Sequence, residues 1–210
     1  VDAVGTNRFV VGAPDDDTGA TNAGSVYLFE WTGSKAVLLS TMTNPAPARA
    51  LSFGHEVSGI GSDLIAVGAV DYSAYTNPGV VYLYRWNGSG VDLQQIFTNP
   101  AADGLNFGTA IEGLDTNRIL IGSENNGYKG GVHLYERSGA AFNLLTTITN
   151  PIFSGSAKFG NFITRFGDDQ FAVGNNAGKS VANGGVFLYA WNGGALILQG
   201  LVTNMATFAI

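Results

Sequence analysis

Three consecutive aspartates, Asp15, Asp16 and Asp17, form the densest cluster of carboxylates in the sequence. Carboxylate oxygens are the ligands that Ca²⁺ prefers, and Thr18-Gly19 and Asn22 supply a turn and a further oxygen. Calcium loops alternate their ligands, however, and adjacent side chains of an extended stretch diverge. The sequence therefore favours a solvated acidic loop and leaves a calcium site at these three aspartates as the alternative.

Trp31, Trp86 and Trp191 follow three similar apolar segments, and Arg137 stands at the corresponding fourth position. Exposed tryptophans can stack on sugar rings, so these three residues are the candidate ligand-binding residues of a lectin. A repeated aromatic stripe more often packs between sheets. Both interpretations stay open at the level of the sequence.

Signals for catalysis are poor. The chain has no cysteine and two histidines, His55 and His133, which stand in different sequence contexts. His55 beside Glu56 is the one neighbouring pair that could exchange a proton, and such a pair alone is a weak signal. His133 replaces a tyrosine in an apolar segment, which predicts a packed side chain. We therefore expect no enzymatic activity and no catalytic residue.

Charge and hydropathy exclude two classes of partner. The net charge is −6, and no cluster of lysine and arginine offers the positive surface that nucleic acid requires. No apolar run reaches the length of a membrane span, about 20 residues. With 45% hydrophobic and 12% charged residues, the chain can instead build a large core.

One unit recurs along the chain, and its period indicates the architecture. The segment Val26-Tyr27-Leu28-Phe29 returns as Val81-Tyr82-Leu83-Tyr84, Val132-His133-Leu134-Tyr135 and Val186-Phe187-Leu188-Tyr189, at offsets of 55, 51 and 54 residues. Thr43-Asn44-Pro45 returns at the same offsets, with Met205 in place of the last proline. Two landmarks that keep step across the chain predict a tandem repeat.

Each copy is typical of four short antiparallel strands, and four such copies predict an all-β, four-bladed β-propeller. The repeats span approximately 1–52, 53–106, 107–158 and 159–210 of a single domain. The first copy lacks its opening segment, which we expect the C-terminal residues Thr207–Ile210 to supply beside Val1–Gly5, within one molecule or between two. Half of an eight-bladed ring formed by two chains is the alternative.

Two short motifs give the repeat a family resemblance. Phe53-Gly54, Phe107-Gly108 and Phe159-Gly160 each precede the expected first strand of a copy, and Gly12-Ala13-Pro14 ends the apolar second strand of the first copy. In these elements the chain resembles the FG-GAP repeat family, found in integrin α-chains and bacterial surface and secreted proteins. The resemblance implies a propeller that binds or scaffolds, and calcium in the loop after Gly12-Ala13-Pro14.

These observations together predict a non-enzymatic, extracellular or cell-surface bacterial scaffold for adhesion or the extracellular matrix. Its expected partners are further copies of itself, in an oligomer or filament, or other surface proteins and glycans. The low charge and the abundance of apolar side chains suit a surface that packs against its own copies. A carbohydrate-binding, lectin-like propeller is the alternative function.

Overall fold

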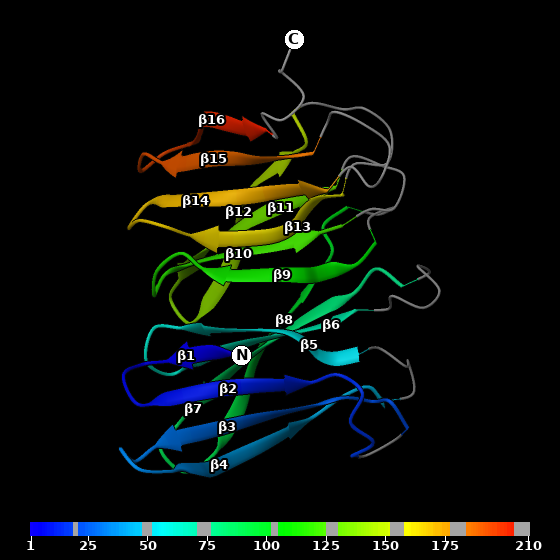
Figure 1. The fold of residues 1–210 in the computed structure, drawn as a ribbon, viewed down its shortest axis with the longest axis vertical. Helices are drawn as coiled ribbons and strands as arrows, with labels where there is room; N and C mark the ends of the chain where they lie inside the picture. Colours follow the sequence, from blue (N-terminus) through cyan, green and yellow to red (C-terminus); the bar gives the residue numbers. More distant parts are fainter. Residues whose placement is uncertain are drawn as a thin grey trace.

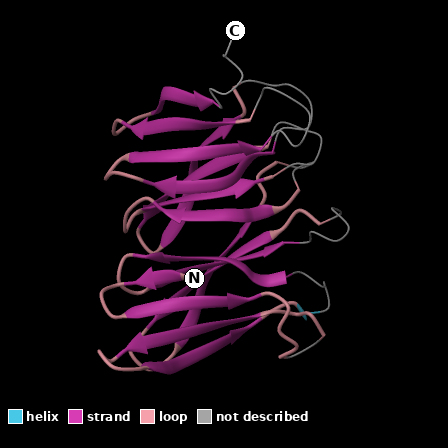
Figure 2. Cartoon of the chain, viewed as in Figure 1, coloured by secondary structure: helices cyan, strands magenta, loops and turns pink. Residues whose placement is uncertain are grey.

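The computed structural model describes residues 1–18, 21–47, 52–70, 77–101, 105–124, 130–151, 158–176 and 184–203. Almost all of these residues form strands joined by turns and loops (Figure 2). The strands make four antiparallel sheets of four strands each, and every sheet is contiguous in sequence. The predicted all-β class and the repeated four-stranded unit are thus confirmed. Within the described residues there is no helix long and apolar enough to cross a membrane.

The first sheet contains β1 (Asp2–Val4), β2 (Arg8–Ala13), β3 (Ser25–Trp31) and β4 (Ala36–Thr43). The second contains β5 (Ser52–Ile60), β6 (Leu64–Val70), β7 (Val80–Trp86) and β8 (Val91–Thr98). The third contains β9 (Phe107–Gly113), β10 (Arg118–Ser123), β11 (Gly131–Ser138) and β12 (Ala141–Thr149). The fourth contains β13 (Lys158–Arg165), β14 (Gln170–Asn176), β15 (Gly185–Trp191) and β16 (Leu196–Thr203).

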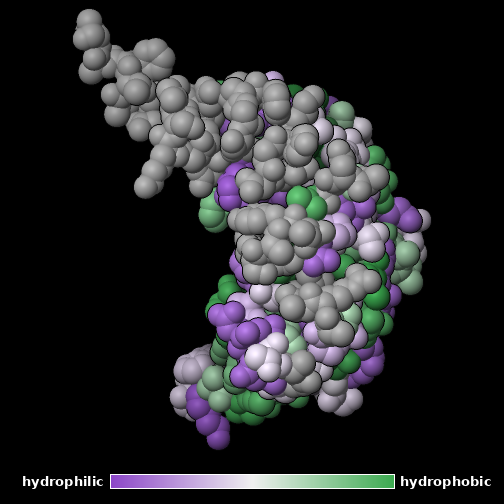
Figure 3. Space-filling model, turned by 90° about the vertical axis from the view of Figure 1, so that its right-hand side faces the viewer, coloured by the Kyte–Doolittle hydropathy of each residue, from purple (hydrophilic) through white to green (hydrophobic). Residues whose placement is uncertain are grey.

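The sheets are stacked in chain order, with the first and the fourth at opposite ends of the row (Figure 1). The first strands of the sheets are neighbours, because β1 packs beside β5, β5 beside β9 and β9 beside β13. Seen from the side, the stack curves into an open crescent (Figure 3). The described residues thus form an arc rather than a closed ring. The predicted pairing of Thr207–Ile210 with the N-terminus lies outside the described residues.

Alternation along the strands gives each sheet two apolar faces, which explains how successive sheets stack. We call the side towards the following sheet the exit face and the side towards the preceding sheet the entry face. In β3, Val26 and Leu28 lie on the exit face, whereas Tyr27 and Phe29 lie on the entry face. Three apolar clusters fill the three junctions between the sheets.

The Phe-Gly pairs are β-bulges at which one sheet comes close to the sheet before it. Gly54, Gly108 and Gly160 have φ near +90° (86°, 93° and 87°), a backbone conformation that favours glycine, and the strand register shifts beside each of them. The preceding phenylalanines Phe53, Phe107 and Phe159 are fully buried. The motif that carries the family resemblance is therefore a packing element here.

Candidate functional site

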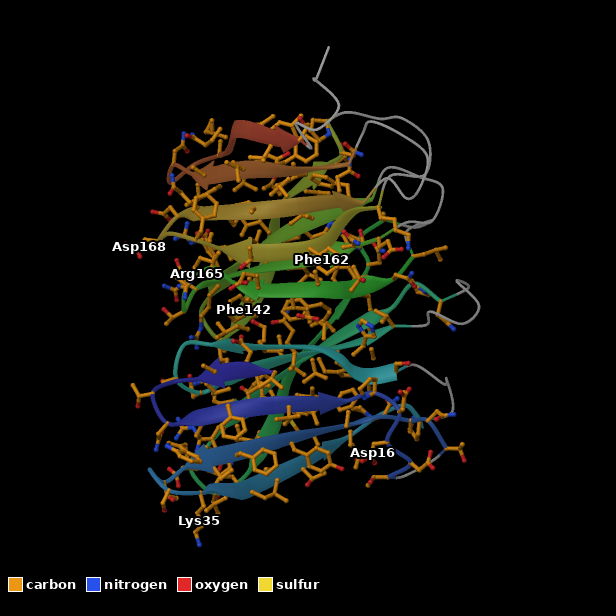
Figure 4. The ribbon with its side chains drawn as sticks, viewed as in Figure 1. Asp16, Lys35, Phe142, Phe162, Arg165 and Asp168 are labelled. Carbon is orange, nitrogen blue, oxygen red and sulfur yellow. The ribbon has the colours of Figure 1, made fainter. Side chains whose placement is uncertain are left out.

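The acidic loop is held by its own hydrogen bonds. One carboxylate oxygen of Asp16, Oδ1, accepts from the Thr18 amide at 2.7 Å and the Ser25 hydroxyl at 3.2 Å, and the other, Oδ2, accepts from the Tyr27 hydroxyl at 2.6 Å. Asp17 Oδ1 accepts from the backbone amide of Asn22 at 2.8 Å. Asp16 thus lies beyond the end of β2 and ties the loop to β3 (Figure 4).

This arrangement gives the aspartates separate roles instead of directing them at one point. Both oxygens of Asp16 and one oxygen of Asp17 already accept protein hydrogen bonds, while Asp15 is exposed. No group of three or more His, Cys, Asp or Glu side chains fit to hold a metal ion is found among the described residues. Calcium binding at this loop stays a prediction, which calorimetric titration of the wild type and of Asp17→Asn with CaCl₂ tests.

We expect Asp16→Asn to lower the melting temperature at pH 7. Hydrogen bonds from the Thr18 side chain and then from Tyr27 lower the pKa of Asp16 from 3.8 to about 2. Because the folded-state pKa is depressed, the stabilisation is present above pH 3.8 and is lost as the pH falls through about 2. The two melting temperatures should therefore converge at pH 2. Asp15→Asn is the matched control and should melt like the wild type at both pH values.

The three tryptophans hold equivalent positions in their sheets. At the end of each third strand a backbone N–H donates to the turn between the first two strands: Trp31 to Asn7 O at 2.7 Å, Trp86 to Asp63 O at 2.7 Å, Arg137 to Asn117 O at 2.8 Å and Trp191 to Asp169 O at 2.8 Å. This contact uses the backbone alone, so it is kept in the third sheet, where arginine stands in place of tryptophan.

Their side chains differ in surroundings. Trp86 packs against the cluster between the first and second sheets, and Trp191 against the cluster between the third and fourth. The Arg118 guanidinium lies 5.9 Å from the centre of the Trp191 ring. Trp31, in the first sheet, is 51% exposed. The structure thus places the three predicted ligand-binding residues at separate sheets, with Trp31 as the ring most open to a sugar.

A hollow of about 330 Å³ opens between the first strands of the second, third and fourth sheets. Its lining includes His55 and Glu56 from β5, Thr109 from β9 and Phe162 from β13, which Figure 4 labels on that strand. Glu124, at the end of the third sheet's second strand, also lines it, and its buried carboxylate pairs with Lys158. Periodicity alone did not reveal this hollow, because its lining comes from three copies.

We expect Glu56→Gln to stabilise the protein above pH 7. Burial is the main cause that raises the pKa of Glu56 from 4.5 to about 7. The folded state therefore holds this proton more tightly than the unfolded state, and stability falls as the pH rises from 4.5 to 7. Discounted for partial solvent contact, the loss is about 2 kcal/mol. Urea unfolding at pH 5 and pH 8 measures it, and the variant should lack this pH-dependent loss.

His133 confirms the expectation of a packed histidine. It is buried in β11, where Nε2 lies 3.0 Å from Ser123 Oγ and Nδ1 lies 2.9 Å from Thr147 Oγ1. Burial lowers the pKa of its imidazole to about 4. Both ring nitrogens have hydroxyl partners, so this side chain bridges three strands of the third sheet.

The two ends of the stack expose faces that are buried elsewhere. Val186 on the exit face of the fourth sheet is 38% exposed, whereas its equivalents in the other sheets, Val26, Val81 and Val132, are each 0% exposed. Beside it, Val202 is 55% exposed. At the other end, Phe9 and Phe29 on the entry face of the first sheet are half-buried, and their rings stack at 5.3 Å. Within the described residues, no further sheet packs against either of these two apolar faces.

Comparison with known proteins finds no family model that matches this chain. A search of curated proteins finds no match either. The resemblance to the FG-GAP repeats therefore rests on the motifs and the spacing given above.

Proposed function

We propose that this chain is a non-enzymatic interaction scaffold of a bacterial surface or extracellular matrix. The observation that carries the proposal is the pair of open end faces, each apolar and each built like the packed junctions inside the stack. A contiguous exposed apolar surface marks a site of protein association. In this proposal the sheets serve as propeller blades. Because the four sheets form an open crescent, the crescent favours a larger ring or a longer stack that contains further blades, instead of a closed ring of four blades.

Other features support a scaffold. The four sheets are joined through three apolar clusters, which gives a frame held together by apolar packing. The loops that follow the second strands differ in length between copies, and variable loops on a rigid frame are a common place for recognition. The Glu56 pKa fits burial of a carboxyl and needs no catalytic role.

Binding assays with the immobilised chain test this function. We expect binding to at least one of three targets: the chain itself, a glycan array, or intact cells of the source bacterium labelled for surface protein. His55→Ala and Glu56→Gln should bind like the wild type. Turnover of an ester, phosphate or glycoside substrate that either variant abolishes would overturn the non-enzymatic assignment, and absence of all three kinds of binding would overturn the scaffold.

A lectin is the second candidate, favoured by the exposure of Trp31. It predicts glycan-array binding that Trp31→Ala abolishes. Trp86→Ala should instead lower stability, because that ring packs against the junction between the first two sheets. Retention of glycan binding by Trp31→Ala would remove the assigned site, and absence of glycan binding by the wild type would remove the candidate itself.

A further inference from the structure

We infer that the exit face of the fourth sheet binds the entry face of the first sheet of a second copy of this chain, head to tail. The inference rests on the proposed scaffold function and names its partner. Both faces belong to one repeated interface that the molecule already makes three times within itself.

The exit faces share one pattern of paired side chains. In each sheet, a central pair on the second and third strands lies beside a pair on the third and fourth strands. These pairs are Val10–Leu28 and Val26–Met42, Ala66–Leu83 and Val81–Phe97, Leu120–Leu134 and Val132–Ile148, and in the fourth sheet Ala172–Leu188 and Val186–Val202. The first three sets lie in or against the junction clusters. The fourth set has the same apolar chemistry with no described sheet over it.

A glycine in each second strand makes room for the backbone of the next sheet. A Cβ on Gly12, Gly68 or Gly122 would lie 1.9, 2.4 or 2.0 Å from the carbonyl oxygen of the following sheet's bulge glycine. Gly174 is the equivalent in the fourth sheet. Its nearest neighbours come from its own sheet, with the Phe162 Cβ at 3.1 Å. The fourth sheet therefore keeps the notch that elsewhere receives a neighbouring blade.

The entry face of the first sheet carries the matching side chains. Phe9 pairs with Phe29 and Val11 with Tyr27 across β2 and β3. The fourth sheet has Phe171–Tyr189 and Val173–Phe187 at these positions, all buried against the third sheet. The Phe9–Phe29 stack at 5.3 Å also resembles the Phe171–Tyr189 stack at 5.6 Å. The exposed ring of Trp31 extends the same face, at the position where Trp191 packs on the third sheet.

Charge favours a second copy as the occupant. The paired rows of both open faces contain no charged residue. At the corner of the first and third junctions a side chain reaches the next sheet's turn: Arg8 Nη2 donates to Ser62 O at 2.7 Å, and Arg118 Nη2 to Asp169 Oδ1 at 2.7 Å. In the fourth sheet the uncharged Gln170 stands where Arg8 and Arg118 begin their strands. In the first sheet the uncharged Asn7 stands at the turn position that Asp169 occupies in the fourth. Joining two copies thus buries no unpaired charge at these positions.

An interface between two different faces is heterologous, so it leaves one open face of each kind on a dimer. Repetition closes a ring if the rotation per chain allows it and otherwise extends a filament. Both outcomes use the same contact, and the particle mass and shape distinguish them.

Complementary variants test this contact by sedimentation velocity and negative-stain electron microscopy. Val202→Glu places a charge on the exit face, and Phe29→Glu places one on the entry face. We expect the wild type to reach at least twice the mass of a single chain, and each variant alone to be monomeric. A mixture should form dimers and nothing larger, because one intact exit face and one intact entry face remain. Ile96→Glu, at an exposed apolar residue of β8, is the matched control and should assemble like the wild type.

Circular dichroism and thermal melting check that both variants fold. If Phe29→Glu does not fold, Phe9→Glu takes its place. Self-association of either variant alone would overturn the proposal, as would a monomeric wild type. A monomer that still binds a glycan or a cell surface overturns this contact and leaves the scaffold function intact.

Discussion

Replacing Gly122 with alanine is expected to destabilise the fold by about 3 kcal/mol or more. A Cβ at this position would lie 2.0 Å from the carbonyl oxygen of Gly160, a backbone atom of the next sheet. The third and fourth sheets would have to separate, and the apolar cluster between them would lose contacts along the whole junction. Urea unfolding of the purified variant measures the loss of unfolding free energy. If the loss is larger still, we expect a reduced yield of folded protein.

Gly174→Ala is the matched control for this prediction. It makes the same chemical change at the same position of the repeat, where the nearest atom is the Phe162 Cβ at 3.1 Å in an exposed side chain. We expect a cost below about 1 kcal/mol, since that neighbour can shift. Equal losses for the two variants would contradict the close approach of successive sheets.

Phe107→Ala is expected to cost about 3–5 kcal/mol, as truncation of a fully buried phenylalanine does. The ring is 0% exposed in the cluster between the second and third sheets, with its centre 6.5 Å from that of Tyr135 and 5.5 Å from that of His133. Its removal leaves a cavity at the bulge through which the two sheets meet. Chemical denaturation monitored by far-UV circular dichroism measures the change.

Phe166→Ala serves as the comparison, because this ring is 54% exposed at the end of the fourth sheet's first strand. Its removal should change the free energy of unfolding by less than about 0.5 kcal/mol. A loss as large as that of Phe107→Ala would mean that the phenylalanine of the Phe-Gly pair has no special place in the core.

The sequence reached the fold through two kinds of signal. The recurrence of Val26–Phe29 at offsets of 55, 51 and 54 residues located the third strand of each sheet, because alternating apolar residues leave a local pattern of period two. Phe53-Gly54 and its equivalents marked the first strands, since a bulge with positive φ requires glycine whatever lies around it. Both signals depend on residues close together in the chain, so they can be recognised in the sequence alone.

The candidate sites depended on contacts that the order of residues does not contain. Asp16 is a hydrogen-bond acceptor for Thr18 and Tyr27, and only the return of the chain along β3 brings Tyr27 to it. The hollow around Glu56 needs first strands from three sheets, which lie about 50 residues apart in sequence.

The sequence by itself determined the repeated four-stranded sheet, because periodicity and glycine positions act within each copy. Only the tertiary structure decided which equivalent residues are buried. Val132 and Val186 occupy the same place in their copies, yet one is covered by the following sheet and the other is exposed on the fourth sheet, at the end of the row. Exposure depends on the neighbour of a sheet, and the neighbour follows from how many sheets are stacked and how far the stack curves.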